Sequence, residues 1–184
     1  MNSKRIALIT GATSGIGEAT ARLLSKNNFK IILCGRRKSR LELLEKELAP
    51  NTEVMIRSFD VCKRKEVAEA LHTLPTGWSD VDVLINNAGG AHGLEPIQSG
   101  NPDDWDAMID TNVKGLLYVT HEILPVMMKR KSGHIINLGS IAGREVYPNG
   151  NVYGASKFAV DALSRGMRVD LNAAGIKVTQ VNPL

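Results

Sequence analysis

The chain has 184 residues, enough for one domain with a hydrophobic core, and 43% of them are hydrophobic, as in ordinary globular proteins. Its net charge is +4 and its pI is about 9.1, but no basic stripe is interleaved with aromatic residues, which argues against a nucleic-acid partner. No apolar run approaches the roughly 20 residues of a membrane span, and the start of the chain has no signal-peptide core. Cys34 and Cys62 show neither a CxxC spacing nor a histidine at metal spacing. We therefore expect a cytoplasmic protein with reduced cysteines, no metal site and no membrane partner.

Short apolar runs alternate with helical patterns along the whole chain. We predict strands at residues 6–10, 29–34, 54–59, 81–85, 133–138 and 177–181. We predict helices from after residue 17 to about 26, and at 38–48, 65–74, 102–131 with a break near 112–115, and 151–173. This alternation is typical of right-handed βαβ units. We therefore expect an α/β fold, a Rossmann-type doubly wound parallel sheet with helices on both faces and the strand order 3-2-1-4-5-6.

A glycine-rich segment, residues 11–17, lies between the first predicted strand and the first helix. Gly11, Gly15 and Gly17 permit positive φ angles and a close approach of the backbone to a phosphate, while the helix start offers free N–H groups. Thr13 and Ser14 add hydroxyls. The spacing is GxxxGxG and differs from the generic GxGxxG, and a tight strand-to-helix turn is the alternative reading. We expect a dinucleotide pyrophosphate here.

Two arginines follow the second predicted strand, at the position that selects the nicotinamide cofactor. An acidic residue there would hold the ribose 2′-hydroxyl of NAD, but this chain has Arg36 and Arg37. Guanidinium groups suit a 2′-phosphate through charge-assisted hydrogen bonds. The alternative is a solvated basic helix start, which the helix dipole disfavours. The pair favours NADP(H) as the cofactor.

Polar and small residues follow the third and fourth predicted strands. Asp60, before Val61, could accept a hydrogen bond from an adenine amine, or it could simply cap the next helix. Asn87, Ala88 and Gly89 end the fourth strand on the same carboxyl edge as the glycine-rich segment, where small side chains leave room for a ribose and a nicotinamide. A strand-ending turn alone would explain the glycine but not the doubled asparagine that precedes it.

Tyr153 and Lys157 lie one helical turn apart in the last predicted helix and therefore share a face. A fixed ammonium beside a phenol favours the phenolate, so the pair could give and take a proton near neutral pH. Ser140, at the end of the fifth strand, could face them across the carboxyl edge. The spacing alone also occurs by chance in many helices, and an isolated loop serine would be unremarkable.

Together these motifs resemble the short-chain dehydrogenase/reductase family, in order and in spacing, over essentially the whole chain. The residues that carry the resemblance are Thr10-Gly11-Ala-Thr-Ser-Gly15-Ile-Gly17, Asn86-Asn87-Ala88-Gly89, Asn112, Ser140 and Tyr153-Gly-Ala-Ser-Lys157. The resemblance implies a catalytic tetrad. Tyr153 would be the general acid/base, Lys157 would lower its pKa and bind the nicotinamide ribose, Ser140 would position the substrate oxygen, and Asn112 would support a proton-relay water.

The resemblance also implies a set of cofactor contacts and a dehydrogenase that transfers a hydride to or from NADP(H). The expected cofactor-binding residues are Gly11, Thr13, Ser14, Gly15, Ile16, Gly17, Arg36, Arg37, Asp60, Val61, Asn87, Ala88, Gly89, Tyr153, Lys157 and Pro183.

Three segments are most similar to NADP-dependent 3-hydroxy acid (serine-type) dehydrogenases of this family: the arginine pair with Arg40 and its neighbour, residues 103–115 and residues 139–160. This subgroup implies a small hydroxy acid or carbonyl substrate. A carboxylate substrate needs a cation, for which Arg144 is a candidate by position and His92 a weaker one.

We interpret residues 1–184 as a single NAD(P)-binding domain that is truncated at its C-terminal end, because members of the family continue past Pro183 with a seventh strand, its helix and a substrate-covering segment. The sequence is compatible with a natural short form and with a piece of a longer protein. An NADP(H)-binding module with little turnover is therefore the alternative to an active oxidoreductase, and an interaction protein that uses only the fold is a third. Apolar residues around the helices 113–128 and 152–169, with the pairing of these helices in the family, predict a homodimer or homotetramer.

Overall fold

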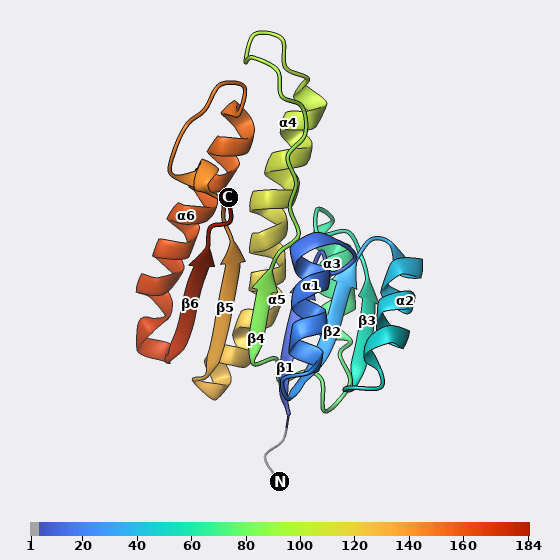
Figure 1. Cartoon of the computed structure of the whole chain (residues 1–184). Coiled ribbons are helices and arrows are strands. Elements are labelled where there is room, and N and C mark those ends of the chain that lie inside the picture. The colour runs from blue at the N-terminus through green and yellow to red at the C-terminus, as the bar shows by residue number, and fades with distance from the viewer. Residues whose placement is uncertain (1–3) are drawn as a thin grey trace.

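The computed structural model describes residues 4–184, which form a six-stranded, all-parallel sheet with the order β3-β2-β1-β4-β5-β6 (Figure 1). The strands are β1 (Arg5–Thr10), β2 (Phe29–Gly35), β3 (Val54–Ser58), β4 (Val83–Asn86), β5 (Gly133–Leu138) and β6 (Ile176–Val181). The helices are α1 (Gly15–Ser25), α2 (Lys38–Leu48), α3 (Arg64–His72), α4 (Pro102–Ile109), α5 (Leu116–Arg130) and α6 (Asn151–Leu171). The predicted fold class and strand order are confirmed.

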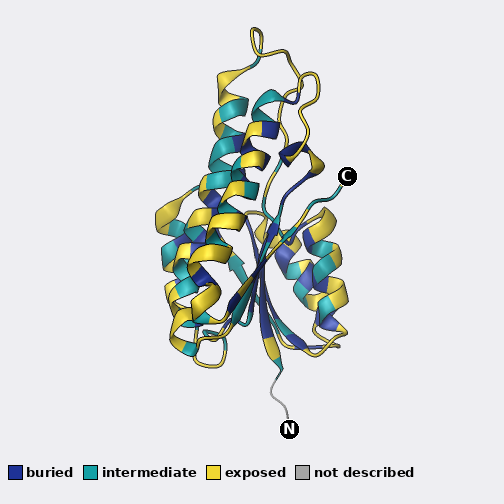
Figure 2. Cartoon of the chain, turned by 90° about the vertical axis from the view of Figure 1, so that its left-hand side faces the viewer, coloured by how far each residue is buried: buried dark blue, intermediate teal, exposed yellow. Residues whose placement is uncertain are grey.

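The sheet lies between two layers of helices, which form two separate hydrophobic cores (Figure 2). On one face, α1 and α2 pack through Ala21, Leu41 and Leu44 against alternate residues of β1 and β2. On the other face, α3, α5 and the end of α6 form the second core with the remaining residues of β1 and β2 and with residues of β4, β5 and β6. Strands that are covered on both faces need apolar side chains at every position, which is why β1 and β2 read as unbroken hydrophobic runs.

Among residues 4–184, helices cover β5 and β6 on one face only. In Figure 1 these two strands face the viewer with no helix in front of them, whereas α1 and α2 cover the neighbouring half of the sheet. Accordingly β6 alternates, with Ile176 and Val178 buried and Lys177 and Thr179 exposed. Within residues 4–184, no helix has both the length and the apolar character needed to cross a lipid bilayer.

The predicted break in the long helical region is a π-helical turn, Asp110–Gly115, which separates α4 from α5. The start of α4 follows from its sequence: the Asn101 side chain accepts a hydrogen bond from the backbone N–H of Asp103, and Pro102 occupies the first turn. Because a π-turn contains more residues per turn than an α-helix, the turn changes which side chains point toward α6. Asn112, in the middle of the turn, is buried.

The connection from β1 to α1 packs directly against the end of β4. Gly11 has a φ of +64°, a conformation that favours glycine. Gly17, in the first turn of α1, allows the closest approach: a Cβ there would collide with the side-chain amide of Asn87 and would lie 2.6 Å from the carbonyl oxygen of Gly11. The glycine at position 17 therefore brings the start of α1 against two loops of the carboxyl edge.

We predict that Gly17→Ala destabilises the protein by about 1–3 kcal/mol, because the added methyl group must displace backbone that cannot move freely. Gly166→Ala is the matched control, since Gly166 lies inside α6 and a Cβ there would meet nothing within 4 Å. It should instead be neutral or stabilise by up to about 1 kcal/mol. Urea unfolding of both variants measures the difference, and equal stabilities would contradict the close packing at position 17.

Candidate active site

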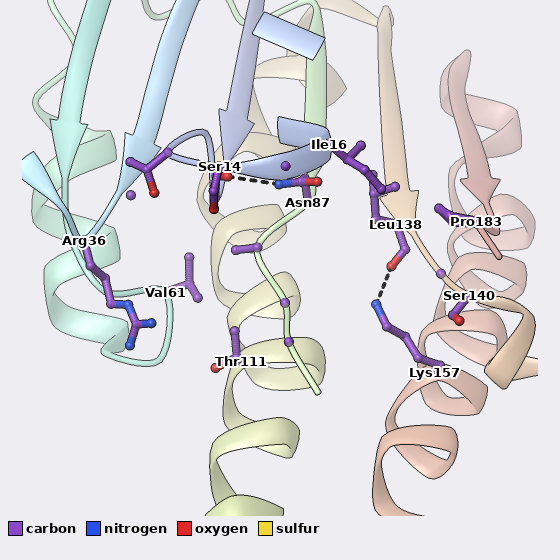
Figure 3. A pocket seen from close by; sticks show the side chains of 18 of the residues that line it. Ser14, Ile16, Arg36, Val61, Asn87, Thr111, Leu138, Ser140, Lys157 and Pro183 are labelled. Atoms are coloured by element: carbon purple, nitrogen blue, oxygen red, sulfur yellow. Dashed lines mark hydrogen bonds between the residues drawn. The ribbon is translucent and has the colours of Figure 1, made fainter. Parts of the chain in front are cut away.

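One cavity of about 570 Å³ opens at the carboxyl edge of the sheet, where the chain leaves β1, β2, β4 and β5 (Figure 3). This volume lies in the range of small-molecule and cofactor sites. Sixteen residues predicted to form the site line it: Gly11, Thr13, Ser14, Gly15, Ile16, Arg36, Arg37, Asp60, Val61, Asn87, Ala88, Gly89, Ser140, Tyr153, Lys157 and Pro183. The structure thus brings together segments from the whole length of the chain.

The glycine-rich segment forms the part of the cavity wall where α1 begins. A Cβ at Gly15 would meet nothing within 4 Å, so this side of the loop is open to a ligand. Ser14 precedes α1 but its side chain does not cap the helix, which leaves the first N–H groups and the positive end of the helix dipole available. This wall fits a diphosphate group without rearrangement of the backbone.

The two arginines have different surroundings. The Arg37 guanidinium donates to the Thr13 hydroxyl through Nε at 3.0 Å and Nη2 at 2.6 Å, and Nη2 also donates to the Ser14 hydroxyl at 2.9 Å. Arg36 is 74% exposed, and its Nη1 lies 3.8 Å from Oδ2 of Asp60. Arg37 is therefore held against the glycine-rich segment. The Arg36 side chain, labelled in Figure 3, lines the cavity and remains mostly exposed.

Asp60 does not cap α3, because the N-cap of that helix is Lys63 and no side chain caps it. Its Oδ1 accepts a hydrogen bond from the backbone N–H of Cys62 at 3.0 Å, which stabilises the turn before α3. The residue also lines the cavity, beside Val61. The helix-capping alternative is therefore wrong: one carboxylate oxygen stabilises the turn before α3, and the second faces Arg36.

The doubled asparagine has a structural explanation, because the two side chains point to different places. Asn86 is buried and donates to Thr120 Oγ1 at 2.9 Å and to Asn137 Oδ1 at 3.0 Å, which joins β4 to α5 and β5. Asn87 instead donates to the backbone carbonyl oxygens of Thr10 at 2.9 Å and Gly11 at 3.2 Å. Only the second asparagine lines the cavity.

Tyr153 and Lys157 extend from α6 into the cavity. The Lys157 Nζ lies 5.8 Å from the centroid of the Tyr153 ring and donates to the carbonyl oxygen of Leu138 at 2.9 Å, as Figure 3 shows for the second contact. Lys157 is only 6% exposed. Burial lowers the pKa of Lys157 from 10.5 to about 8, because the ammonium has left water without gaining a carboxylate partner. A proton on this amine is therefore held less tightly than on an ordinary lysine.

Ser140 reaches the same cavity from the end of β5. Its hydroxyl accepts from the backbone N–H of Ala142 at 3.2 Å and so fixes the short turn that follows. That turn packs closely on α6, since a Cβ at Gly143 would lie 2.7 Å from the carbonyl oxygen of Lys157. The close packing places Ser140 on the side of the cavity that α6 forms.

Three predicted site residues do not line the cavity: Gly17, Asn112 and Arg144. Gly17 contributes through its packing, and Asn112 through hydrogen bonds to the backbone of Gly90. Arg144 is exposed and lies outside the cavity, so the structure gives no support to its role as a carboxylate partner. His92 packs over Gly90, beside a small second hollow that Tyr153 also borders.

Sequence reasoning missed several residues that line the cavity, and Leu138 and Thr111 are two of them. Leu138 supplies the carbonyl that holds Lys157, and its position at the end of a predicted strand was the available signal. Thr111 lines the cavity beside Asn112, which was singled out while its neighbour was not. Among residues 4–184, no group of three or more His, Cys, Asp or Glu side chains is placed to bind a metal ion.

Comparison with known proteins gives matches over nearly the whole chain. The profile of a family described as "short chain dehydrogenase" matches residues 5–184. The NADP-dependent 3-hydroxy acid dehydrogenase YdfG of Salmonella typhi is 48% identical over 178 residues, which are 97% of this chain and 71% of that protein. The serine 3-dehydrogenase of Agrobacterium fabrum is 44% identical over 176 residues, 96% of this chain and 70% of that protein.

Solved structures agree with this result. The closed form of a serine dehydrogenase complexed with NADP+ superposes with a TM-score of 0.94 at 46% identity, over 97% of this chain and 71% of that one. The family expected from the glycine-rich, asparagine and tyrosine–lysine motifs is confirmed by both kinds of match. The chain belongs to the short-chain dehydrogenase family.

Proposed function

We propose that this protein is an NADP(H)-dependent oxidoreductase that interconverts a hydroxyl and a carbonyl group on a small hydroxy acid, alcohol or carbonyl compound. The observation that carries the proposal is a single cavity bordered by an open glycine-rich wall, by Arg36 and Arg37, and by Tyr153 with the buried Lys157. Relatives that are 44–48% identical are named as NADP-dependent 3-hydroxy acid and serine 3-dehydrogenases, which supports the cofactor and the substrate class.

The cofactor would be bound by the chain's backbone and cations. The N–H groups at the start of α1 suit the diphosphate, and the arginine pair suits a 2′-phosphate. NADP(H), when bound, supplies or accepts the hydride. The protein's own residues then have to orient the substrate and to move one proton.

Tyr153 is the proposed proton donor for carbonyl reduction and the proton acceptor for alcohol oxidation. A cationic Lys157 in the same pocket stabilises the phenolate that forms when Tyr153 gives up its proton. The Ser140 hydroxyl is the proposed partner of the substrate oxygen. Asn112 acts from outside the cavity, through the backbone of Gly90.

We also propose that two copies or four copies of the chain associate through α5 and α6. Most of the apolar residues that suggested this contact pack inside the protein, because Leu116, Val119 and Ile123 are buried. The support comes from apolar side chains that remain exposed on these two helices, namely Leu117, Met128, Phe158 and Val169. A cytoplasmic location is proposed from the reduced cysteines, and burial raises the pKa of the Cys34 thiol, which makes it unreactive.

Replacing the proposed acid/base tests the chemistry. We expect Tyr153→Phe to lower kcat for NADPH-dependent reduction by about 10²–10⁴-fold, because only the transferable proton is lost. The affinity for NADPH should change by less than about threefold, as no cofactor-binding backbone is altered. The decrease of NADPH absorbance with a panel of small aldehydes, ketones and 3-oxo acids measures turnover, and fluorescence titration measures binding.

Tyr147→Phe is the matched control for this experiment. Tyr147 lies in the loop before α6 and does not line the cavity, so the same loss of a hydroxyl should leave kcat within about twofold. If the parent protein binds NADPH but reduces no member of the panel, the alternative of a binding module is favoured. Undiminished turnover by Tyr153→Phe would refute the assigned role.

Cofactor preference tests the arginine pair. We expect Arg36→Asp to weaken NADPH binding by about 10–100-fold and to spare NADH, since each charge-assisted hydrogen bond to a phosphate contributes about 1.5–3 kcal/mol. Arg40→Asp makes the same change of charge in the first turn of α2 but outside the cavity, so it should affect both cofactors little. Equal weakening of NADPH and NADH by Arg36→Asp would rule out a contact with the 2′-phosphate.

The lowered pKa of Lys157 predicts a pH-dependent contribution to stability. Between about pH 8 and 10.5 the native state has released this proton while the unfolded state still binds it. The free energy of unfolding therefore rises with pH in this window. Below pH 8 both states are protonated and the cost of burying the charge is fully present. The change from 10.5 to about 8 corresponds to at most about 3 kcal/mol.

Lys157→Met isolates this effect, because other titrating groups cancel when the variant is compared with the parent. We expect the stability of the parent relative to Lys157→Met to increase from pH 7.5 to pH 10.5 in urea unfolding. A difference that does not vary across this range would show that the amine titrates near its ordinary value.

A further inference from the structure

A chain of hydrogen bonds, whose two linking side chains are buried outside the cavity, joins the loop after β4 to the turn of α6 that carries Tyr153. Its members are the backbone of Gly90, the side chain of Asn112, the hydroxyl of Ser156 and the carbonyl oxygen of Tyr153. Asn112 and Ser156 are 2% and 0% exposed, so water does not compete for these bonds. The motifs noted in the sequence did not assign a function to Ser156.

The side chain of Asn112 forms a two-bond pair with one peptide segment. Its Oδ1 accepts from the Gly90 N–H at 2.9 Å, and its Nδ2 donates to the Gly90 carbonyl oxygen at 2.9 Å. Nδ2 carries two hydrogens, and the second is donated to Ser156 Oγ at 3.0 Å. Both donors of the amide are therefore used within the protein.

Ser156 connects this amide to the backbone beside the catalytic pair. Its hydroxyl donates to the carbonyl oxygen of Tyr153 at 2.7 Å and accepts from Asn112. Ser156 lies between Tyr153 and Lys157 in the same helical turn. A movement of this turn relative to Asn112 would leave a buried N–H without a partner, which is costly.

The wall that Asn112 holds is close to the reacting groups. A Cβ at Gly89 would lie 2.9 Å from Asn112 Oδ1 and 3.7 Å from the Nζ of Lys157. Gly89 and Gly90 also line the cavity. The chain of hydrogen bonds therefore connects the wall formed by Gly89 and Gly90 to the wall formed by Tyr153 and Lys157.

We propose that Ser156 is a positioning residue, which holds the Tyr153–Lys157 turn of α6 in a fixed register with the Gly89–Gly90 wall through Asn112. The inference rests on the proposed function, since it assigns to Tyr153 the proton transfer described above. Ser156 itself touches neither the cavity nor, by this proposal, the substrate.

The chain supplies a closely matched control, Ser164, two turns further along α6. Ser164 is also 0% exposed, its hydroxyl donates to a backbone carbonyl oxygen, that of Val160, at 2.8 Å, and it accepts from a buried amide, Asn137 Nδ2, at 2.9 Å. Ser156→Ala and Ser164→Ala therefore delete the same group and orphan the same kind of donor. They differ in whether the partner amide holds the cavity wall.

Hydrogen exchange of the Gly90 amide tests the link without requiring activity. We expect Ser156→Ala to speed this exchange by about tenfold relative to the parent, because a loosened Asn112 protects the N–H less well. Ser164→Ala should leave it within about twofold, after correction for global stability with the amide of Leu8 in β1. Equal acceleration in the two variants would overturn the proposal.

Steady-state kinetics then tests the consequence for the reaction. We expect Ser156→Ala to lower kcat by about tenfold with KM and NADPH affinity changed by less than about threefold, and Ser164→Ala to keep kcat within about twofold. If Ser156→Ala speeds hydrogen exchange of the Gly90 amide but has the same kcat as Ser164→Ala, positioning of the catalytic turn is refuted. If the parent turns over no substrate, the proposed function is wrong, and the Gly90 comparison alone decides whether Ser156 fixes the wall.

Discussion

The connection between β1 and β4 is the contact on which the cavity depends. β1 lies between β2 and β4 in the sheet, so the strand order changes direction between β1 and β4. The loops that follow β1 and β4 therefore diverge. The Thr10 hydroxyl accepts from the backbone N–H groups of Asn87 and Ala88, both at 3.0 Å. The Asn87 side chain returns two bonds to the carbonyls of Thr10 and Gly11. The diverging loops are thus joined at their bases, and the space between them is a cavity with fixed walls.

Buried amide side chains also form hydrogen bonds that link α5 and α6 to each other and to the strands they cover. Asn112, beside α5, donates to Ser156 of α6. Further along the two helices, Asn86 of β4 donates to Thr120 of α5 and to Asn137 of β5, and Asn137 donates to Ser164 of α6. Each amide is far from water, so a shift of α5 against α6 would break bonds that solvent cannot replace. Apolar packing alone tolerates small sliding movements, whereas these directional contacts permit one arrangement. The arrangement of α5 and α6 that borders the cavity is therefore specified by polar groups in an otherwise apolar layer.

Local patterns were enough to predict the strands, their order and most of the cavity lining, because apolar runs, glycine spacing and strand ends are all short-range signals. Two features needed contacts between distant segments. Arg144 is close to Ser140 in sequence, but the 3-10 turn Ile141–Gly143 separates them, and Arg144 is exposed and does not line the cavity. The role of Leu138 is carried by its carbonyl group, which no side-chain pattern reveals.

The π-helical turn Asp110–Gly115 also limits how the length of this helix can change. A π-turn holds one residue more than the α-helical turn it replaces, so removing one residue there would restore a regular helix while α4 and α5 kept their phase. Removing one residue from α5 itself would rotate everything beyond it by about 100° and turn its buried side chains toward water. Within this helical region, a deletion of one residue would therefore preserve the phase of α4 and α5 only if it fell among these six residues, and it would alter the turn that places the Asn112 amide against Gly90. A deletion in the π-turn would therefore disturb the cavity, whereas a deletion in α5 would disturb the packing of the fold.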